Sequence, residues 1–391
     1  MTMALEGVRI LDFTQMMLGP FGTQLLADLG ADVIKVERLE GEWERGLPMQ
    51  GELVRGDSAA FLAMNRNKRS VAVDLRSERV QDALLRIGTE CDVVVENFRP
   101  GVLAARGLGY EDFRKVKPDI IYCSGSGWGQ DTRYAKEGRP GQDLLIQAMS
   151  GLAANGGRAQ DPPTPAGTAI VDAASALYLA NGILAALVAR ARHGIGQKVE
   201  VDLYSTAIAL QCQEISSLVN QDKEFSRSAS GVGQAWLNAP FGVYRTRNGW
   251  LAIAMAPVRT VADLLGAQDV ARLDPWADRD RIKTALEEQT VRHDTQHWLD
   301  VLLPAGVWCA RVRSTAEAVD ELRRDGSDLI VRTRQGQDGD VELIGCPVRL
   351  SGTPWRLRYA PPRVGEHTDE VLGEVLPPEQ LTRLREAGVV A

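Results

Sequence analysis

The residue in this sequence best placed to do chemistry is a lone carboxylate. Asp172 is the only charged residue in GTAIVDAASALYLANGILAAL, residues 167–187, where it directly precedes a long apolar run. A carboxylate at such a place can be a helix N-cap, which accepts backbone N–H groups, or a nucleophile that forms a covalent intermediate. A helix dipole would favour its ionised form by about 0.3 to 1 kcal/mol. These residues alone leave both interpretations open.

A membrane span is a third interpretation of the same segment. The uncharged run from Ala173 to Ala189 carries Asn181 and Gly182 near its middle, and it is slightly shorter than the roughly 20 apolar residues that cross a bilayer. We therefore predict a buried helix that begins at Asp172 and ends near Gly194, and we expect no membrane association.

The second chemically suggestive set consists of basic residues near the predicted ends of strands: Arg38, Arg76, Arg99, Arg106, Arg139 and the NRNKR segment at 65–69. Charged residues are mostly exposed, so each one alone is compatible with a solvated surface. Guanidinium groups bind phosphate oxygens in a bidentate manner, and several that converge would offset the charge of a diphosphate. Together these residues predict a polyphosphate site.

Other common chemistries lack their motifs. The first strand-to-helix turn reads QMMLGPFGT where a dinucleotide site needs GxGxxG, and GSGWG at 125–129 follows the fifth strand without the required helix. His293 and His297 occur in HDTQH, which lacks the glutamate of HExxH and a third ligand. The five cysteines have no CxxC spacing, and GxSxG is absent. We expect no metal, no NAD, and no acyl chemistry through serine or cysteine.

The elements that must position these residues alternate along the first third of the chain. Strands that are apolar on both faces are predicted at 8–13, 31–37, 70–75, 92–98 and 119–125, with helices at 20–30 and, capped by Ser77, at 78–88. Strands separated by helices predict an α/β fold with a parallel, doubly wound sheet. In such a sheet ligands bind beyond the carboxyl ends of the strands, where most of the arginines above are expected.

The rest of the chain predicts a smaller α+β unit. EVDLYS (200–205) starts a linker with helical character, and a hairpin at 241–255 has Asn248-Gly249 in its turn. Helices are predicted at 258–266, 280–302 and 314–324, with strands in GVWCARV, DLIVRTR and VELIGCPVRL. We predict a large domain at 1–200, a linker at 201–225, a small domain at 226–330, a second linker at 331–362 and C-terminal helices at 363–391.

Composition limits the class of protein. The chain has 391 residues, of which 44% are hydrophobic and 25% charged, and a formal net charge of −7. This length allows two domains, and the charge lacks the basic footprint of a nucleic-acid-binding protein. Glu6 and Arg9 occur before any apolar run, unlike in a secretory signal. We expect a cytoplasmic protein that binds small molecules.

Seven segments resemble, in order and spacing, the class III CoA-transferases typified by formyl-CoA transferase: DFTQMMLGPFGTQLLADLGADVIKVE, NRNKRSVAVDL, VVVENFRPGVL, QDLLIQAMSGL, GIGQKVEVDL, FGVYRTRNGWLAIA and GEHTDEVLGEVL. The resemblance covers nearly the whole chain. It implies an interlocked homodimer in which each protomer has a Rossmann-like large domain, a smaller domain and a C-terminal tail that returns to the large domain. The implied partners are an acyl-CoA donor and a carboxylic acid acceptor, with coenzyme A as a carried substrate and no ATP, metal or further cofactor.

The resemblance also implies roles for individual residues. Asp172 matches the catalytic aspartate, which becomes first a mixed anhydride and then an aspartyl-CoA thioester. Gln15 matches a position at the site entrance, where it can hydrogen-bond the acyl carboxylate, and the neighbouring Met16 suggests an acyl group with an apolar portion. GVGQ, with Gly231, Gly233 and Gln234, matches a loop that closes over the intermediates, although it is also compatible with an ordinary flexible loop.

Coenzyme A is implied to lie along the strand ends, and the residues matched to its binding are Met17, Leu18, Arg38, Val73, Asp74, Leu75, Arg76, Asn97, Phe98, Arg99, Arg106 and Arg139.

Two alternatives stay open at this point. One is an α-methylacyl-CoA racemase of the same superfamily, which moves a proton with a histidine in a GHD segment. Here the segment is GQD, and Gln142 cannot accept and return a proton near neutral pH. The other is a protein that binds CoA without turnover, in which Asp172 is only a helix cap.

Overall fold

A computed structural model describes residues 2–223, 225–335 and 339–391. The chain forms two compact units. The larger unit consists of Met1–Ile146, Ala169–Thr206 and Gly326–Ala391, and the smaller unit consists of Gln147–Thr168 and Ala207–Asp325.

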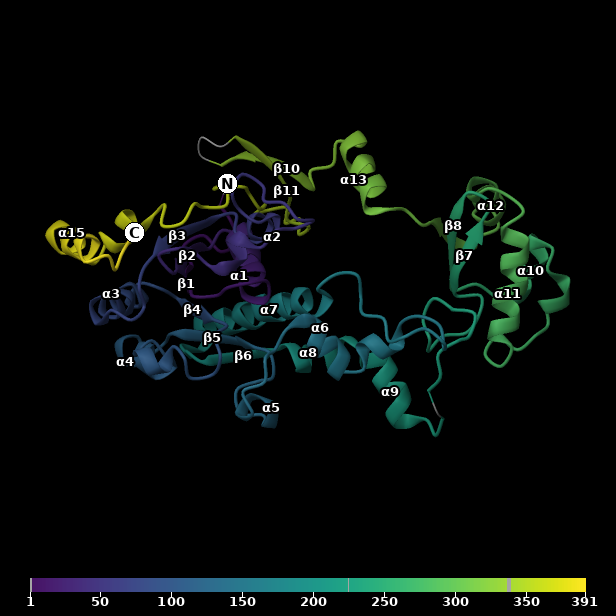
Figure 1. Cartoon of the computed structure of the whole chain (residues 1–391), viewed down its shortest axis with the longest axis horizontal. Helices are drawn as coiled ribbons and strands as arrows, with labels where there is room; N and C mark the ends of the chain where they lie inside the picture. Colours follow the sequence, from purple (N-terminus) through teal and green to yellow (C-terminus); the bar gives the residue numbers. More distant parts are fainter. Residues whose placement is uncertain (1, 224, 336–338) are drawn as a thin grey trace. The chain divides into compact units, whose positions relative to one another are not determined.

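The larger unit is built on a six-stranded sheet in the order β3-β2-β1-β4-β5-β6 (Figure 1). Its strands are β1 (Arg9–Asp12), β2 (Asp32–Glu37), β3 (Lys68–Ala72), β4 (Val93–Glu96), β5 (Ile121–Ser126) and β6 (Lys198–Asp202). All five neighbouring pairs are parallel. The predicted α/β class with a doubly wound parallel sheet is thereby confirmed, and the carboxyl ends of the strands meet at one edge.

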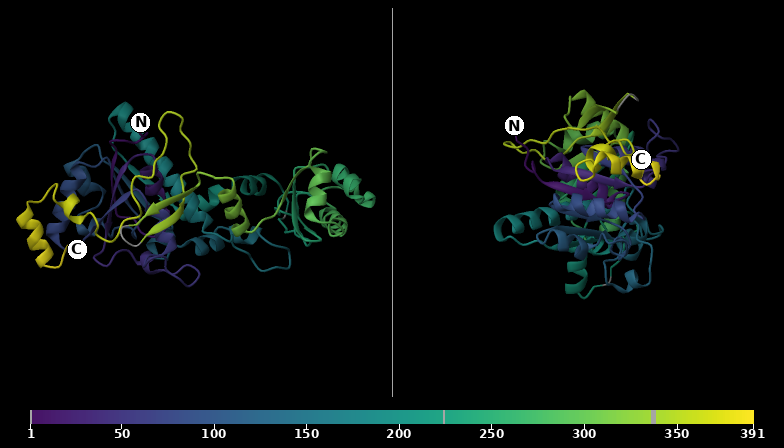
Figure 2. Two further views of the ribbon diagram at one scale, coloured as in Figure 1. Left: turned by 90° about the horizontal axis from the view of Figure 1, so that it is seen from above. Right: turned by 90° about the vertical axis from the view of Figure 1, so that its left-hand side faces the viewer.

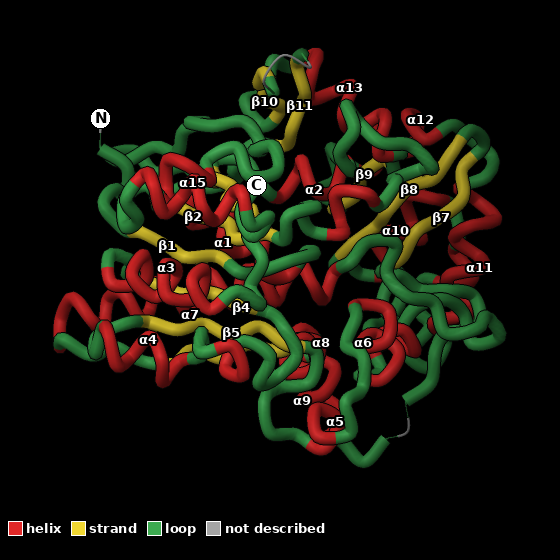
Figure 3. The backbone as a smooth tube through the Cα atoms, turned by 60° about the vertical axis from the view of Figure 1, so that its left-hand side comes forward, coloured by secondary structure: helices red, strands yellow, loops and turns green. Residues whose placement is uncertain are grey.

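One face of the sheet packs on helices from both ends of the chain (Figure 3). These helices are α3 (Glu78–Thr89), α4 (Tyr110–Val116), α14 (Thr368–Leu372) and α15 (Pro378–Glu386). Leu11, Ile34 and Val94 belong to this core. Because side chains alternate along a strand, the equally buried Ile10 and Val33 face the opposite side of the sheet.

The opposite side of the sheet is covered by α1 (Leu18–Asp28) and α7 (Ile170–His193). The two helices approach closely at Gly22, where an added Cβ would lie 3.0 Å from the carbonyl oxygen of Ala176. The shorter helices of the larger unit are η1 (Trp43–Gly46), α2 (Ala59–Met64), η2 (Ala104–Arg106) and α5 (Arg133–Lys136). Two helices cross the boundary between the units, α6 (Asp143–Met149) and α8 (Leu203–Leu210).

The C-terminal segment lies beside α3 and the end of β3 (Figure 2). The N–H of Asp74 donates to the carbonyl of Val389 at 2.9 Å, and the N–H of Ala391 donates to that of Ala72 at 3.1 Å. The last residues of the chain therefore help to hold the segment that follows β3.

Several local predictions are wrong. β3 begins at Lys68, so NRNKR is partly strand, and the segment is buried. Arg66 pairs with Asp28 and Arg69 with Asp32, both at 2.5 Å. Since these cations neutralise carboxylates inside the fold, the segment adds nothing to a polyphosphate site.

Other differences concern elements that depend on tertiary contacts. EVDLYS is not the start of a linker, because it lies in β6 and the beginning of α8. β10 (Ile330–Arg334) and β11 (Asp340–Ile344) form a separate hairpin, which packs on Phe61 in the larger unit. Ser77 stands at the N-cap of α3, but its side chain makes no cap hydrogen bond.

The smaller unit contains an antiparallel sheet of β7 (Gly242–Thr246), β8 (Gly249–Ala254) and β9 (Trp308–Arg311). The turn of its hairpin is Arg247-Asn248, one residue earlier than predicted, because Gly249 already pairs with Thr246. Its helices are η3 (Leu152–Asn155), α9 (Cys212–Asn220), α10 (Val258–Leu265), η4 (Gln268–Val270), α11 (Arg279–Thr290), α12 (Thr295–Leu302) and α13 (Thr315–Arg324). The core of this unit joins β7 and β8 to α10, α11 and α12.

Among the described residues, α7 is the one helix long and apolar enough by composition to cross a membrane, with a mean hydropathy of 1.6 in its most apolar window. Of that window 44% is buried, and α7 packs on α1, β5 and β6. A core helix meets the same criteria of length and composition.

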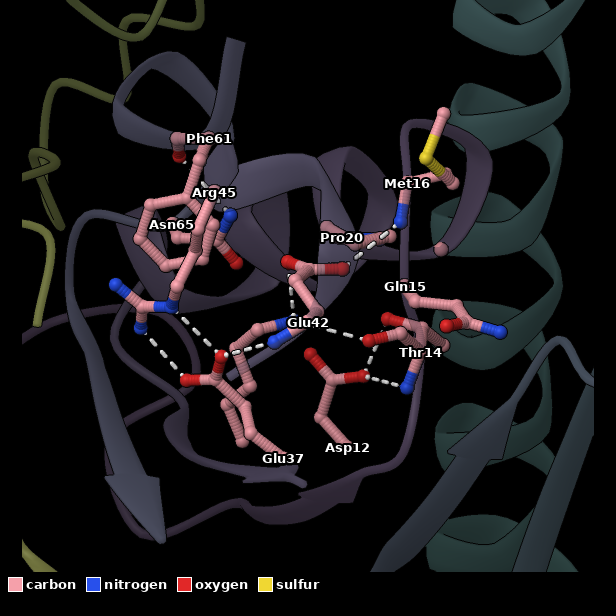
Figure 4. A network of polar contacts seen from close by, with 12 residues as sticks. Asp12, Thr14, Gln15, Met16, Pro20, Glu37, Glu42, Arg45, Phe61 and Asn65 are labelled. Atoms are coloured by element: carbon pink, nitrogen blue, oxygen red, sulfur yellow. Dashed lines mark hydrogen bonds and ion pairs between the residues drawn. The ribbon is translucent and has the colours of Figure 1, made fainter. Parts of the chain in front are cut away.

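A network of buried charges lies under the loop that follows β1 (Figure 4). The carboxylate of Asp12 accepts hydrogen bonds from the N–H of Thr14 at 2.9 Å and the hydroxyl of Thr23 at 2.6 Å, and Lys68 Nζ lies 3.2 Å from it. Lys35 Nζ donates to the carbonyl of Thr14 at 2.9 Å. Burial opposes ionisation of Asp12, but the two lysines and the hydroxyl donors hold its pKa below the usual value.

The same network continues to the segment after β2. Glu42 pairs with Lys35 at 3.0 Å and accepts the N–H of Met16, also at 3.0 Å. Arg45 binds Glu37 at 2.7 Å and Asp57 at 3.2 Å. The backbone of the loop at residues 14–16 is thus held by hydrogen bonds to Asp12 on β1, Lys35 on β2 and Glu42.

We expect Asp12→Asn to lower the free energy of unfolding by about 3 to 5 kcal/mol, because the buried Lys68 and Lys35 would lose their shared counter-charge. Urea denaturation monitored by circular dichroism measures this. Asp328, whose carboxylate forms an exposed pair with Arg349, provides the control, and Asp328→Asn should cost less than about 1 kcal/mol. Equal costs for the two variants would contradict a stabilising role of the network.

Candidate active site

Asp172 is the third residue of α7, and it does not cap the helix. The N-cap position is Ala169. The amides of Val171 and Asp172 donate to one oxygen of Asp143, Oδ2, at 2.8 Å and 3.0 Å. Asp143 is the first residue of α6 and is only 3% exposed. A carboxylate from another segment therefore accepts the amides at the start of α7, and the side chain of Asp172 is left for another role.

The electrostatics at this position oppose ionisation of Asp172. Burial, and next the negative charge of Asp143, raise the pKa of Asp172 to about 7. The helix dipole, from which we expected a stabilised carboxylate, is outweighed by desolvation. Near neutral pH the group is thus present in both forms, and a carboxyl group poised in this way is typical of catalytic sites.

The loop after β1 places Gln15 and Met17 beside the strand ends. The side chain of Asn97, just after β4, accepts the N–H of Gln15 at 2.9 Å and donates to its carbonyl at 2.7 Å. Met16 follows with a left-handed φ of 63°. The amide side chain of Gln15 points away from the ionic network (Figure 4). Gln15 and Met17 are half-buried, whereas Leu18 is buried in α1.

A pocket of about 350 Å³ lies at the carboxyl ends of β2 and β3. It brings together seven of the predicted CoA-binding residues: Arg38, Val73, Asp74, Leu75, Arg76, Phe98 and Arg106. Arg76 is bound to the carboxylate of Asp74, with its Nη2 at 2.9 Å. Arg106 donates to the carbonyl of Val102 at 2.9 Å. The pocket thus combines cationic groups with an apolar wall.

A second pocket of about 370 Å³ lies beyond β4 and β5, and Phe98 lines both pockets. Asn97, Arg99 and Arg139 line this second pocket. The Arg139 guanidinium pairs with Glu137 at 2.6 Å and lies 4.6 Å from the centre of the Tyr134 ring. The GSGWG segment needs a glycine at position 127 for a steric reason, because a Cβ on Gly127 would lie 2.4 Å from the Cα of Gly141.

The GVGQ segment belongs to the smaller unit, whereas Asp172 and both pockets belong to the larger one. Gly231 has a φ of 82°, which favours glycine. Its N–H donates to the hydroxyl of Ser228 at 2.9 Å. The side chain of Gln234 donates to Glu214. The segment is therefore a hydrogen-bonded turn within its own unit.

Two buried carboxyl groups were missed in the sequence: Asp143, which binds the amide of Asp172, and Glu44 in η1. Asp143 left one signal, because it is an acidic residue that opens an apolar helical segment, as Asp172 does. Glu44 left none. It is 2% exposed, and its Oε2 has no hydrogen-bond partner among the described residues. Burial and the charge of Glu42, with a contribution from Asp172, raise the pKa of Glu44 to about 7 although Lys35 and Lys68 oppose this.

Comparison with known proteins gives consistent matches. The family model described as CoA-transferase family III matches residues 5–368. The succinyl-CoA:glutarate CoA-transferase of Mus musculus is 32% identical over 95% of this chain and 86% of that protein. The formyl-CoA:oxalate CoA-transferase of Streptomyces coelicolor is 31% identical over 99% of each. The crystal structure of a CAIB/BAIF family protein from Brucella suis is 29% identical, with a TM-score of 0.81, and covers 96% of this chain and 100% of that chain.

We expect Asp172→Asn to make the protein more stable at pH 8 than the wild type, by roughly 2 kcal/mol. The folded wild type keeps the Asp172 proton up to about pH 7, whereas the unfolded chain loses it near pH 4. The wild type therefore loses stability from this group as the pH rises between these values. Denaturant titrations at pH 4.5 and pH 8 measure the difference.

The gain should be much smaller at pH 4.5, because this pH lies only slightly above the pKa of the unfolded chain and the wild type has lost only a small part of the stability from this group. Asp131→Asn, at an exposed position, is the control and should show no such pH-dependent gain. If Asp172→Asn were less stable than the wild type at pH 8, the folded protein would stabilise the ionised carboxylate, and this would contradict the raised pKa.

Proposed function

Because the chain belongs to CoA-transferase family III, we propose that Asp172 passes CoA from an acyl-CoA donor to a carboxylic acid acceptor. The observation that carries this proposal is the hydrogen bonding at the start of α7. Asp143 accepts both amides there, so Asp172 has no structural duty as a cap. Burial destabilises the Asp172 carboxylate, and no cation among the described residues compensates it. Such a carboxylate is a more reactive nucleophile than one in an ion pair.

The proposed reaction consists of four substitutions at carbonyl groups. First, an Asp172 carboxylate oxygen attacks the thioester carbonyl, a C–O bond forms, and the C–S bond breaks to release CoA thiolate. Second, the thiolate attacks the aspartyl carbonyl, and the anhydride C–O bond breaks to release the first acid as its carboxylate. The acceptor carboxylate then displaces thiolate from Asp172, and thiolate finally attacks the acyl carbonyl and frees Asp172. Bonds and charges balance without ATP.

We place the nucleotide part of CoA in the pocket at the ends of β2 and β3. Arg38 and Arg106 would contact its phosphates, and the apolar wall with Phe98 would take the adenine. The second pocket, with Arg99 and Arg139, extends this site along the ends of β4 and β5. Together the two pockets would suit an extended ligand that begins at the end of β3 and continues along the ends of β4 and β5.

The remaining roles follow the family resemblance. Gln15 would hydrogen-bond an oxygen of the acyl group beside the apolar Met16 and Met17. GVGQ would close over the intermediates and supply backbone N–H donors to the oxyanion, as such donors do in other acyl transfers.

We further propose an interlocked homodimer, which the exposed apolar side chains on α7, Leu177, Tyr178 and Val188, support. A cytoplasmic location is consistent with five unpaired cysteines.

Asp172→Asn should abolish CoA transfer, with a loss on the order of 10⁴-fold or more, because the covalent carrier is removed. The assay uses succinyl-CoA and formyl-CoA as donors with glutarate and oxalate as acceptors, and follows each CoA ester by liquid chromatography. Intact-protein mass spectrometry of the wild type should detect an adduct of the mass of CoA that maps to Asp172. Asp131→Asn is the control and should retain transfer. A CoA-sized adduct on Asp172→Asn would contradict the assignment.

Arg38→Ala should weaken CoA binding by about 10- to 100-fold, because a charge-assisted hydrogen bond contributes about 1.5 to 3 kcal/mol. Isothermal titration calorimetry with CoA alone measures this without turnover. Arg114, exposed on α4, serves as the control, and Arg114→Ala should bind CoA as the wild type does. Unchanged affinity in Arg38→Ala would place the phosphates elsewhere.

A further inference from the structure

A further pocket of the larger unit lies between α3 and the C-terminal helix α15 (Figure 1). Its volume is about 290 Å³, and it shares no lining residue with the two pockets at the strand ends. The residues that line this α3–α15 pocket are Arg79, Asp82, Ala83, Arg86, Leu376, Gln380, Arg383 and Leu384. The proposed transfer of CoA uses none of them.

The base of the α3–α15 pocket is apolar and belongs to the core of the larger unit. Ala83 on α3, Leu376 just before α15, and Leu384 on α15 are buried, and all three are part of the cluster that packs on the sheet. The base is therefore fixed by core packing, whereas the polar lining residues are exposed.

Three cationic side chains surround this apolar base. Arg79 and Arg86 lie two turns apart on one face of α3, and Arg383 lies on α15. Within the described part of the chain, no ion pair or side-chain hydrogen bond engages any of the three. Asp82 is the one acidic residue among the lining residues. The lining thus has three cations and one carboxylate, a net charge of +2.

Nearby arginines differ from these three in having acidic partners. Arg76, just before α3, binds Asp74 at 2.9 Å, and Arg385, two residues after Arg383, binds Asp369 at 2.6 Å. The whole chain carries a net charge of −7, so a group of uncompensated cations around one cavity is contrary to its overall balance. Such a concentration of positive charge attracts anions from solution.

The charge and size of the pocket indicate what kind of anion it suits. Guanidinium groups bind phosphate oxygens in a bidentate manner, and a diphosphate group carries enough negative charge to offset the lining. Pockets for small molecules usually have volumes of about 300 to 1,000 Å³. This pocket is at the lower end of that range, so it suits a diphosphate or a mononucleotide better than a long acyl-CoA.

We propose that the α3–α15 pocket is a second anion site, which binds a diphosphate group through Arg79, Arg86 and Arg383. The diphosphate is either free or part of a nucleotide, whose base would lie on Leu376 and Leu384. The inference goes beyond the proposed function, because binding at this site requires neither Asp172 nor turnover.

Both helices of this site are joined to the segment that lines the CoA pocket. Gln81 of α3 donates to the carbonyl of Leu75 at 2.8 Å. α15 leads to the end of the chain, where the N–H of Ala391 donates to Ala72 and the carbonyl of Val389 accepts the N–H of Asp74. A ligand that connects α3 to α15 therefore supports the 73–76 segment from its far side, and it should slow the local opening of these hydrogen bonds.

The test is isothermal titration calorimetry with ADP, inorganic pyrophosphate and adenosine at about 0.15 M salt, where weak surface attraction is screened. All variants carry Arg38→Ala, which weakens the pocket proposed for CoA. ADP should bind saturably to this background. Adding Arg86→Ala and Arg383→Ala should weaken that binding by about tenfold or more, because charge-assisted hydrogen bonds are lost.

Arg385→Ala in the same background is the matched control. Arg385 lies on α15 outside the lining of the pocket, so this variant should bind ADP as the background does. Urea denaturation of each variant checks folding. An equal loss of affinity in the control would overturn the site, because it would show a general effect of surface charge.

The three ligands distinguish the source of the diphosphate. Tighter binding of ADP than of pyrophosphate would support a nucleotide with its base on the leucines, and equal binding would support a free diphosphate. Adenosine that binds as tightly as ADP would overturn the proposal. Binding of neither diphosphate at millimolar concentration, or affinity unchanged by the loss of Arg86 and Arg383, would overturn it as well.

Hydrogen–deuterium exchange followed by mass spectrometry tests the connection to the CoA pocket. ADP should slow exchange in the peptides that contain the amides of Asp74 and Ala391, by about fivefold or more. The slowing should be absent once Arg86→Ala and Arg383→Ala are added. Unchanged exchange in the background protein would overturn the connection. These measurements involve no acyl transfer, so failure of this site and failure to form a CoA adduct on Asp172 are separate results.

Discussion

At the start of α7 the carboxylate of Asp143, and not that of Asp172, accepts hydrogen bonds from the backbone N–H groups of the helix. Asp143 accepts the amides of Val171 and Asp172. The first N–H groups of a helix need hydrogen-bond acceptors. When the acceptor comes from a different segment, a carboxylate in the first turn is not needed for this purpose. Asp172 then experiences burial and the negative charge of Asp143, and no hydrogen bond from the described residues compensates its side chain. Its raised pKa is the electrostatic consequence of this arrangement.

The site is held in place by charges that are themselves buried. Asp12, Lys35 and Lys68 lie at the centre of the network beneath the loop after β1. Buried ion pairs are weak evidence for net stability, because desolvation offsets much of their attraction. Their effect here is geometric. They hold the carbonyl of Thr14 and the N–H of Met16, and with Asn97 they give the backbone of Gln15 one position.

The two kinds of carboxyl group in this region differ in their partners. Asp12 and Glu37 are surrounded by cations and hydroxyl donors, so their pKa values are lowered despite burial. Asp172 and Glu44 have few or no such donors, so their pKa values rise to about 7. The same fold therefore contains acids that always carry charge and hold the backbone, and acids that can gain or lose a proton near neutral pH.

Much of the large unit could be predicted from local patterns. Strands that are buried on both faces are continuous apolar runs, so β1, β2, β4 and β5 were predictable to within two residues, and the parallel sheet followed from the helices between them. β6 was missed because KVEVD alternates polar and apolar residues at a sheet edge, and only its pairing with β5 identifies it as a strand. The β10-β11 hairpin was assigned to the wrong unit because nothing in its sequence encodes the contact with Phe61.

The residue types and spacing alone singled out Asp172 as a candidate and placed Arg38, Arg76 and Phe98 at strand ends, because these features depend on local periodicity. The tertiary structure decided their partners. It placed NRNKR in ion pairs, supplied Asp143 as the acceptor at the start of α7, and buried Glu44 with an Oε2 that has no hydrogen-bond partner among the described residues. Hydrogen bonding and desolvation depend on which segments meet in space, and residues 28 or more positions apart in the chain carry no local signal of that meeting.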